Sequence, residues 1–153
     1  MTTISNDKQL RDLINGLDSD RQRTLGGRFA GSLLGITSNT RLQRAIEVAS
    51  DADSTAEDIA EALKAARAVA NDTYTACGRD ADWMAQAEHF VARACAAALS
   101  PPEQLGAAEN PAWKAAMYAR MAKNCQMIET GEGEGETENE AQHQYEVAAA
   151  FGR

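Results

Sequence analysis

The sequence contains few of the residues that carry chemistry or crosslinks. Aromatic residues make up 5% of the chain, and there are only two histidines and three cysteines. The cysteines, Cys77, Cys95 and Cys125, form no Cys-x-x-Cys pair, and each lies in an alanine-rich stretch. This pattern is typical of small buried thiols in a reducing cytosol. A chain of 153 residues also buries enough surface to fold without disulfides or a structural metal.

Long apolar runs are missing as well. No stretch approaches the roughly 18 apolar residues that a membrane-spanning helix needs. The first residues, Met1-Thr-Thr-Ile-Ser5, do not combine a basic region with an apolar stretch, as a signal peptide would. We therefore expect a soluble cytoplasmic protein that makes no contact with a membrane.

Alanine, in contrast, is abundant, and supplies about a fifth of the chain, so that hydrophobic residues reach 44%. Alanine is the best helix former and is depleted from strands. The composition predicts an all-α fold, a single-domain bundle of about six to eight alanine-rich helices packed through small side chains.

Capping residues and apolar periodicity divide the chain into helices. Ser19, Thr40 and Asn110 are the expected caps of three of them, and Ser54-Thr-Ala-Glu57 has the pattern of a capping box. The predicted helices span about residues 7–16, 20–35, 41–50, 55–76, 82–99, 101–107, 111–129 and 138–151. We expect a helical body over residues 1–128, a flexible acidic Gly/Glu bridge over 129–137, and a C-terminal helix over 138–153 that docks on or extends from the body.

Two of these helices carry distinctive rows of residues. Gly27, Gly31 and Gly35 recur every four residues, and each costs up to about 1 kcal/mol relative to alanine in a helix interior. We expect this row to be a helix-packing surface that lets another backbone approach closely. The helix at 111–129 has its large apolar residues spaced for one buried face, namely Trp113, Met117, Met121, Cys125 and Ile128.

The negative charge is concentrated near the end of the chain. The net charge is −8, and residues 129–153 hold seven acidic residues against Arg153 alone. Most of these acids belong to the run Glu129-Thr-Gly-Glu-Gly-Glu-Gly-Glu-Thr-Glu-Asn-Glu140. The run is either a solubilising linker or an anionic segment that recognises a basic protein partner and steers its approach. In the second case the partner-binding residues are Glu132, Glu134, Glu136, Glu138 and Glu140.

Candidate sites for chemistry are few. Glu140 and His143 have the Glu-x-x-His spacing of di-iron bundles, but that site needs the motif twice, and His89 has glutamine three residues before it. His89 and Cys95 are six residues apart, which does not place them on one helix face. We therefore expect no catalytic residue, no metal and no cofactor. Nucleic-acid binding is disfavoured because the chain has no surplus of positive charge to neutralise phosphates.

The arginines show two further patterns. Arg21, Arg23 and Arg28 form the densest basic cluster and are expected to make surface ion pairs. Similar triplets, about 26 residues apart, occur on three successive helices: Ala66-Arg67-Ala68, Ala92-Arg93-Ala94 and Ala119-Arg120-Met121. They either mark an internal repeat or reflect only the resemblance of one alanine-rich helix to another.

From about residue 18 to residue 123, the order of sequence blocks resembles the helical immunity-protein family of bacterial polymorphic toxin systems. The blocks concerned are Arg28-Phe-Ala30, Arg41-Leu-Gln-Arg-Ala-Ile-Glu-Val-Ala49, Ala65-Ala-Arg-Ala-Val-Ala70 and Ala112-Trp-Lys-Ala-Ala-Met-Tyr-Ala-Arg120. The resemblance implies a cytoplasmic protein that neutralises a cognate toxin by binding it. We therefore expect a small, acidic, non-enzymatic inhibitor of immunity type. The alternative is a scaffold protein that forms a homodimer or a larger assembly through the glycine row.

Overall fold

The computed structural model describes residues 3–77, 83–101, 110–131 and 136–151. These residues form seven α-helices and no strand, which confirms the all-α prediction. The helices are α1 (Asp7–Asn15), α2 (Ser19–Gly31), α3 (Thr40–Ser50), α4 (Ala56–Cys77), α5 (Trp83–Leu99), α6 (Pro111–Thr130) and α7 (Glu136–Phe151). The short helix predicted at 101–107 falls almost entirely outside the described residues.

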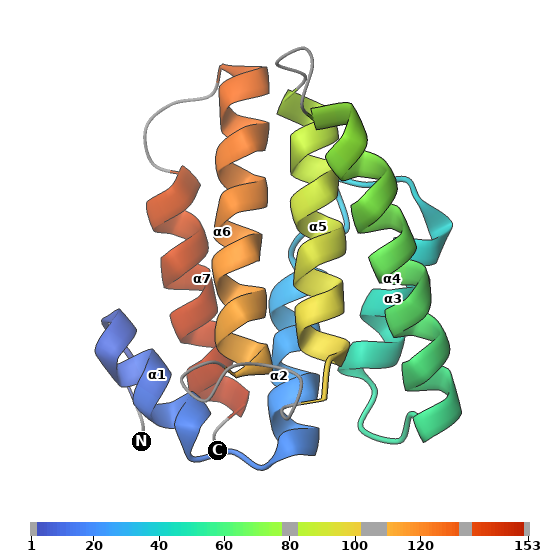
Figure 1. Cartoon of the computed structure of the whole chain (residues 1–153). Coiled ribbons are helices and arrows are strands. Elements are labelled where there is room, and N and C mark those ends of the chain that lie inside the picture. Colours follow the sequence, from blue (N-terminus) through green and yellow to red (C-terminus); the bar gives the residue numbers. More distant parts are fainter. Residues whose placement is uncertain (1–2, 78–82, 102–109, 132–135, 152–153) are drawn as a thin grey trace.

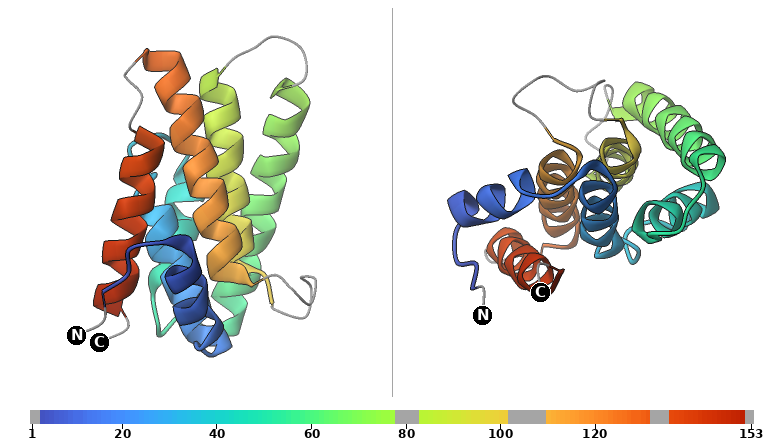
Figure 2. Two further views of the ribbon diagram at one scale, coloured as in Figure 1. Left: turned by 90° about the vertical axis from the view of Figure 1, so that its left-hand side faces the viewer. Right: turned by 90° about the horizontal axis from the view of Figure 1, so that it is seen from below.

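The last four helices stand side by side in the order α4, α5, α6, α7 and alternate in direction (Figure 1). In that view helix α2 lies behind α5 and α6, and α3 lies behind α4, whereas α1 covers the lower ends of α6 and α7. Seen from below, α3 and α4 flank one side of the central helices α2, α5 and α6, whereas α1 and α7 flank the other (Figure 2). Two buried clusters follow from this arrangement, one on each side of the centre.

Alanine makes the central contacts. The α6 side chains that are fully or almost fully buried are Pro111, Ala112, Ala115, Ala116, Ala119, Ala122 and Cys125. The face predicted for α6 is therefore wrong except at Cys125, because Trp113 and Met117 are only partly buried and Met121 and Ile128 are exposed. Small side chains on α6 let its axis approach the axes of α2 and α5, and they therefore occupy the face of α6 that contacts those helices. The larger side chains of α6 point away from this centre.

Polar contacts fix α7 and α1 to α6. Arg120 donates to both carboxylate oxygens of Asp7, at 2.7 and 3.0 Å, and to Gln144 Oε1 at 2.9 Å. Gln144 is fully buried and donates in turn to the Ala116 carbonyl, and the Tyr145 hydroxyl donates to Asp7. The C-terminal helix thus docks on the body. The boundaries predicted for the acidic bridge are too wide, since α6 extends to Thr130 and α7 begins at Glu136.

The basic cluster on α2 packs rather than forming only surface ion pairs. The guanidinium groups of Arg21 and Arg28 lie 4.9 and 5.0 Å from the ring centroid of Phe151, close enough for cation–π attraction. Arg23 is buried, and it donates to the Asp51 carbonyl at 2.8 Å and to the Ala49 carbonyl at 3.4 Å. It therefore satisfies carbonyls at the end of α3, in addition to a 3.4 Å pair with Asp20.

Three of the four predicted caps are displaced by one residue, α7 begins two residues earlier than predicted, and α2 ends at Gly31 instead of at residue 35. Asp18 caps α2, Asn39 caps α3 and the Thr55 hydroxyl accepts from Asp58 N–H at the start of α4. Asn110 caps α6 as predicted, with Pro111 in the first turn. Within the described chain, none of the helices is long and apolar enough to cross a membrane.

Candidate functional site

The structure places the predicted acidic residues in different settings. Glu132 and Glu134 lie outside the described residues. Glu136 and Glu138 belong to the first turn of α7, and their side chains also lie outside the description. Glu140 is only 5% exposed, so its carboxylate is not part of an exposed acidic surface, contrary to expectation.

Glu140 is held against the end of α2. Ser32 Oγ lies 2.6 Å from Glu140 Oε1 and 2.9 Å from the Phe29 carbonyl oxygen, and the hydroxyl has one proton to share between them. Burial raises the pKa of the Glu140 carboxyl, and the Ser32 hydrogen bond only partly opposes this. A protonated Glu140 would donate to Ser32 while Ser32 donates to Phe29, which satisfies the whole group.

The glycine row splits into two parts. A Cβ atom added at Gly27 would lie 2.6 Å from the Ser50 backbone nitrogen, so α2 and α3 can approach only because this residue is glycine. At Gly31 and Gly35 an added Cβ meets none of the described atoms within 4 Å, so the prediction of close packing within the described chain is wrong there. Gly26, which the four-residue spacing did not include, provides the second close approach, with the Cβ of Ala98 at 3.0 Å.

The outward side of α6 carries an apolar stripe that is covered only in its lower half. Trp113 and Met117 pack into the cluster formed with α1 and α7. Met121, the next residue of the stripe after Met117, is 48% exposed. Ile128, about two turns further along α6, is 43% exposed. The exposed half of the stripe ends beside Glu129, where the acidic run begins. Two exposed apolar side chains on α6 therefore lie just before the most acidic part of the sequence.

His89 and Cys95 do not form a reactive pair. The Thr73 hydroxyl donates to the Val69 carbonyl at 2.7 Å, so His89 Nδ1, at 2.9 Å, is the donor to Thr73. His89 Nε2 is then free to accept from Arg93 Nε at 3.4 Å. Desolvation lowers the pKa of His89, in keeping with a neutral ring. Cys95 is fully buried, and burial raises the pKa of its thiol to about 12.

Possible metal ligands are not gathered together. Glu140 contacts Ser32, while His143, three residues later, is exposed. Across the parts of the chain that the structure describes, no group of three or more His, Cys, Asp or Glu side chains is arranged to hold a metal ion.

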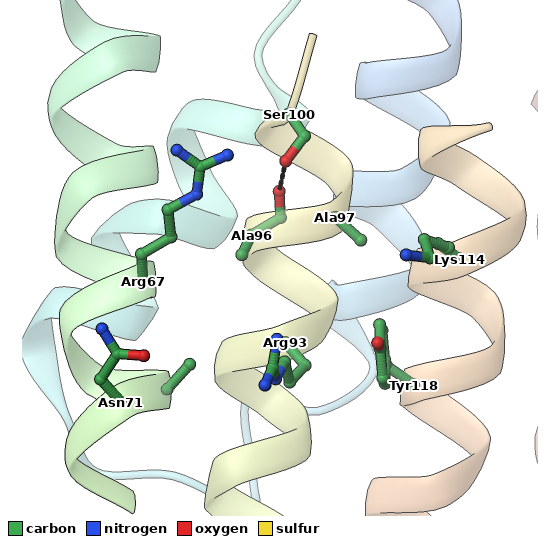
Figure 3. Close-up of a pocket in the computed structure, with 9 residues that line it drawn as sticks. Arg67, Asn71, Arg93, Ala96, Ala97, Ser100, Lys114 and Tyr118 are labelled. Carbon is green, nitrogen blue, oxygen red and sulfur yellow. Dashed lines mark hydrogen bonds between the residues drawn. The ribbon is translucent and has the colours of Figure 1, made fainter. Parts of the chain in front are cut away.

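One cluster was not identified from the sequence. Arg67, Arg93 and Lys114 line a hollow of about 290 Å³ across α4, α5 and α6 (Figure 3). Two of them belong to the Ala-Arg triplets, whereas the third triplet places Arg120 on the far side, against Asp7. The triplet spacing was the available signal, but it does not reveal which arginines face the same way.

Comparison with known proteins adds no family assignment. No family model matches the chain, and no match was found among curated proteins or solved structures. The resemblance to immunity proteins stays a prediction from the sequence pattern.

Proposed function

We propose that this protein is a small, non-enzymatic, protein-binding inhibitor of immunity type that neutralises a basic partner such as a toxin. The observation that carries the proposal is the exposed half of the α6 stripe, Met121 and Ile128, next to Glu129. Interfaces combine an apolar centre with a polar or charged rim, and methionine is enriched in them. An apolar patch beside glutamates complements a partner surface that is apolar at its centre and basic around it.

The acidic run contributes to the approach of the partner. Charges of one sign steer an oppositely charged protein before contact, and the effect decreases with salt. The apolar residues then determine how slowly the complex dissociates, since short-range contacts act mainly on the dissociation rate. This division of roles predicts different kinetic effects for the two sets of residues.

The test uses the product of the gene beside this one, because the family resemblance implies a toxin encoded next to its inhibitor. The double variant Met121→Ser/Ile128→Ser should dissociate faster from that protein, by roughly tenfold or more, since it loses two apolar contacts. Tyr74→Ser is the matched control, because Tyr74 is 67% exposed but lies on α4. Equal dissociation rates for the double variant and the parent would contradict the proposal.

A homo-oligomeric scaffold is the second candidate, and one observation favours it. The space beside Gly31 and Gly35 is not filled by the described part of the monomer, so another backbone could approach this part of the row. Gly31→Leu should then leave the monomer folded and lower the oligomeric mass measured by light scattering. A parent protein that is monomeric at all concentrations would exclude this candidate.

A further inference from the structure

Helix α7 docks on the body through a face that is mostly polar. It lies at the edge of the bundle, against α6, α2 and α1 (Figure 2). The buried side chains among its described residues recur every four positions and are Glu140, Gln144 and Ala148. A buried polar side chain stabilises the folded state only if its hydrogen bonds are satisfied. The attachment of α7 therefore depends on the bonding of Glu140 and Gln144.

The two halves of α7 are attached differently. The described apolar side chains of α7 that pack into the cluster with α1, α2 and α6 belong to its second half and are Tyr145, Val147, Ala148, Ala149 and Phe151. In the first half, the structure describes the side chains of residues 140–143, and among these Glu140 alone is buried. Gln144 lies between the halves, and its amide, which does not ionise, bonds to Arg120 and to the Ala116 carbonyl. Within the described residues, a change in the charge of Glu140 therefore acts on the first half.

The contact between Glu140 and the end of α2 favours a protonated carboxyl. Ser32 Oγ lies 2.6 Å from Glu140 Oε1 and 2.9 Å from the Phe29 carbonyl oxygen. When the carboxyl is protonated, it donates to Ser32 while Ser32 donates to Phe29, so both bonds form at once. When the carboxyl is ionised, the single hydroxyl proton satisfies one of two acceptors, and a negative charge is held at 5% exposure.

The charges that face Glu140 come from α6 and from α7 itself. Burial raises the pKa of the Glu140 carboxyl. Lys123 and Arg120 on α6 and His143 on α7 oppose this shift but do not cancel it. Arg120 is also paired with Asp7 on α1, at 2.7 Å, and the end of α2 contributes a neutral serine hydroxyl. Ionisation of the carboxyl in the docked helix is therefore unfavourable.

We propose that protonation of Glu140 controls the docking of the first half of α7, so that ionisation releases about residues 136–143 while the second half stays docked. Glu140 lies about one turn from Glu136, where the helix begins, so the chain can open there without breaking the contacts of residues 144–151. The released part carries Glu136, Glu138 and Glu140 and lengthens the acidic run that is free to meet a basic surface. This consequence for a partner rests on the proposed function, whereas the release is a property of the chain alone.

The test is hydrogen exchange of the full chain, read by mass spectrometry from mildly acidic to mildly basic pH and corrected for the intrinsic pH dependence of amide exchange. Docking is strongest below the ordinary pKa of glutamate and weakens as pH rises through the raised pKa of Glu140. In the parent, the protection of residues 136–143 should fall by roughly tenfold or more across this window, while that of residues 145–151 stays constant. Glu140→Gln should keep this protection at every pH. Glu146→Gln, at an exposed position of the same helix, should behave like the parent.

Three results would overturn the proposal. The first is protection of residues 136–143 that does not vary with pH in the parent. The second is the same fall in Glu140→Gln, which would assign the effect to another group, and loss of the fall in His143→Gln would identify that group as His143. The third is a simultaneous loss of protection in all helices, which would show global unfolding.

A separate measurement tests the consequence for a partner. Association with the product of the neighbouring gene is followed at a pH below and a pH above the release. Faster association of the parent at the higher pH, without this gain in Glu140→Gln, would connect the release to recognition. If that product does not bind at either pH, the proposed function fails, whereas the exchange data still decide whether the helix is released.

Discussion

At the residue scale, two carboxyl groups are shifted in opposite directions by their surroundings. Hydrogen bonds from Arg120 lower the pKa of Asp7, with a smaller contribution from Tyr145, although partial burial opposes them. Burial raises the pKa of Glu140, with Ser32 as its nearest partner. The two groups therefore make stability depend on pH in opposite senses.

Glu140→Gln should stabilise the protein at neutral pH. The folded-state pKa of Glu140 lies above its unfolded value, so its contribution is complete below the unfolded pKa and is lost as pH rises through the folded pKa. Glutamine keeps an oxygen for Ser32 and has no charge to desolvate. Thermal melts between mildly acidic and mildly basic pH should show a variant whose advantage grows with pH. Glu146→Gln, an exposed site on the same helix, is the control, and a lower melting temperature for Glu140→Gln at neutral pH would contradict the assignment.

Asp7→Asn should destabilise the protein at neutral pH by about 1 kcal/mol, because it weakens the ion pair with the mostly buried Arg120. The effect is no larger because solvent screens the charge of the half-exposed Asp7. The folded-state pKa of Asp7 is depressed, so the parent holds this stability above the unfolded pKa and loses it as pH falls through the folded pKa. The difference between parent and variant in urea unfolding should therefore vanish in acid. Asp12→Asn, which removes only the exposed pair with Lys8, should have almost no effect. A difference that persists in acid would mean that Asp7 acts through packing.

At the element scale, local patterns predicted most helix starts to within one residue, but not the end of α2 or which face of α6 is buried. Large apolar residues usually mark the core side of a helix, which favoured Trp113, Met117 and Met121. On α6 the side with alanines is buried instead, since a helix with neighbours on several sides packs most closely through its smallest residues. The size of the side chains on the neighbouring helices decides which face of α6 is buried. Those helices are distant from α6 in sequence, so a local pattern does not reveal them.

Glycine substitutions on α2 test the packing directly. Gly27→Ala should cost several kcal/mol or prevent folding, because its Cβ would lie 2.6 Å from the Ser50 nitrogen and 2.7 Å from the Ala49 carbonyl carbon, both of them backbone atoms. Gly31→Ala should be neutral or stabilising by up to about 1 kcal/mol, since the space beside it is open and alanine favours the helix. Denaturant melts of both variants measure the difference. Equal destabilisation would contradict the arrangement of α2 and α3.

At the scale of the whole molecule, the all-α class followed from composition, but the sites formed between helices did not. Arg67 and Arg93 are 26 positions apart, and only the lateral order α4, α5, α6 brings them to one hollow with Lys114. Glu140 belongs to an acidic run by sequence, yet the docking of α7 buries it against Ser32. Charge and periodicity describe each helix by itself, whereas these contacts depend on which helices are neighbours.

The acidic segment tests the central proposal most directly, through association kinetics with the neighbouring gene's product across ionic strength. Changing Glu132, Glu134, Glu136 and Glu138 to Gln should leave the melting temperature nearly unchanged, as expected for solvated charges. Stopped-flow association should be slower for this variant than for the parent at low salt, by roughly tenfold or more, and should depend less on salt. Identical association rates for parent and variant at every ionic strength would contradict the proposal that this segment recognises a basic partner.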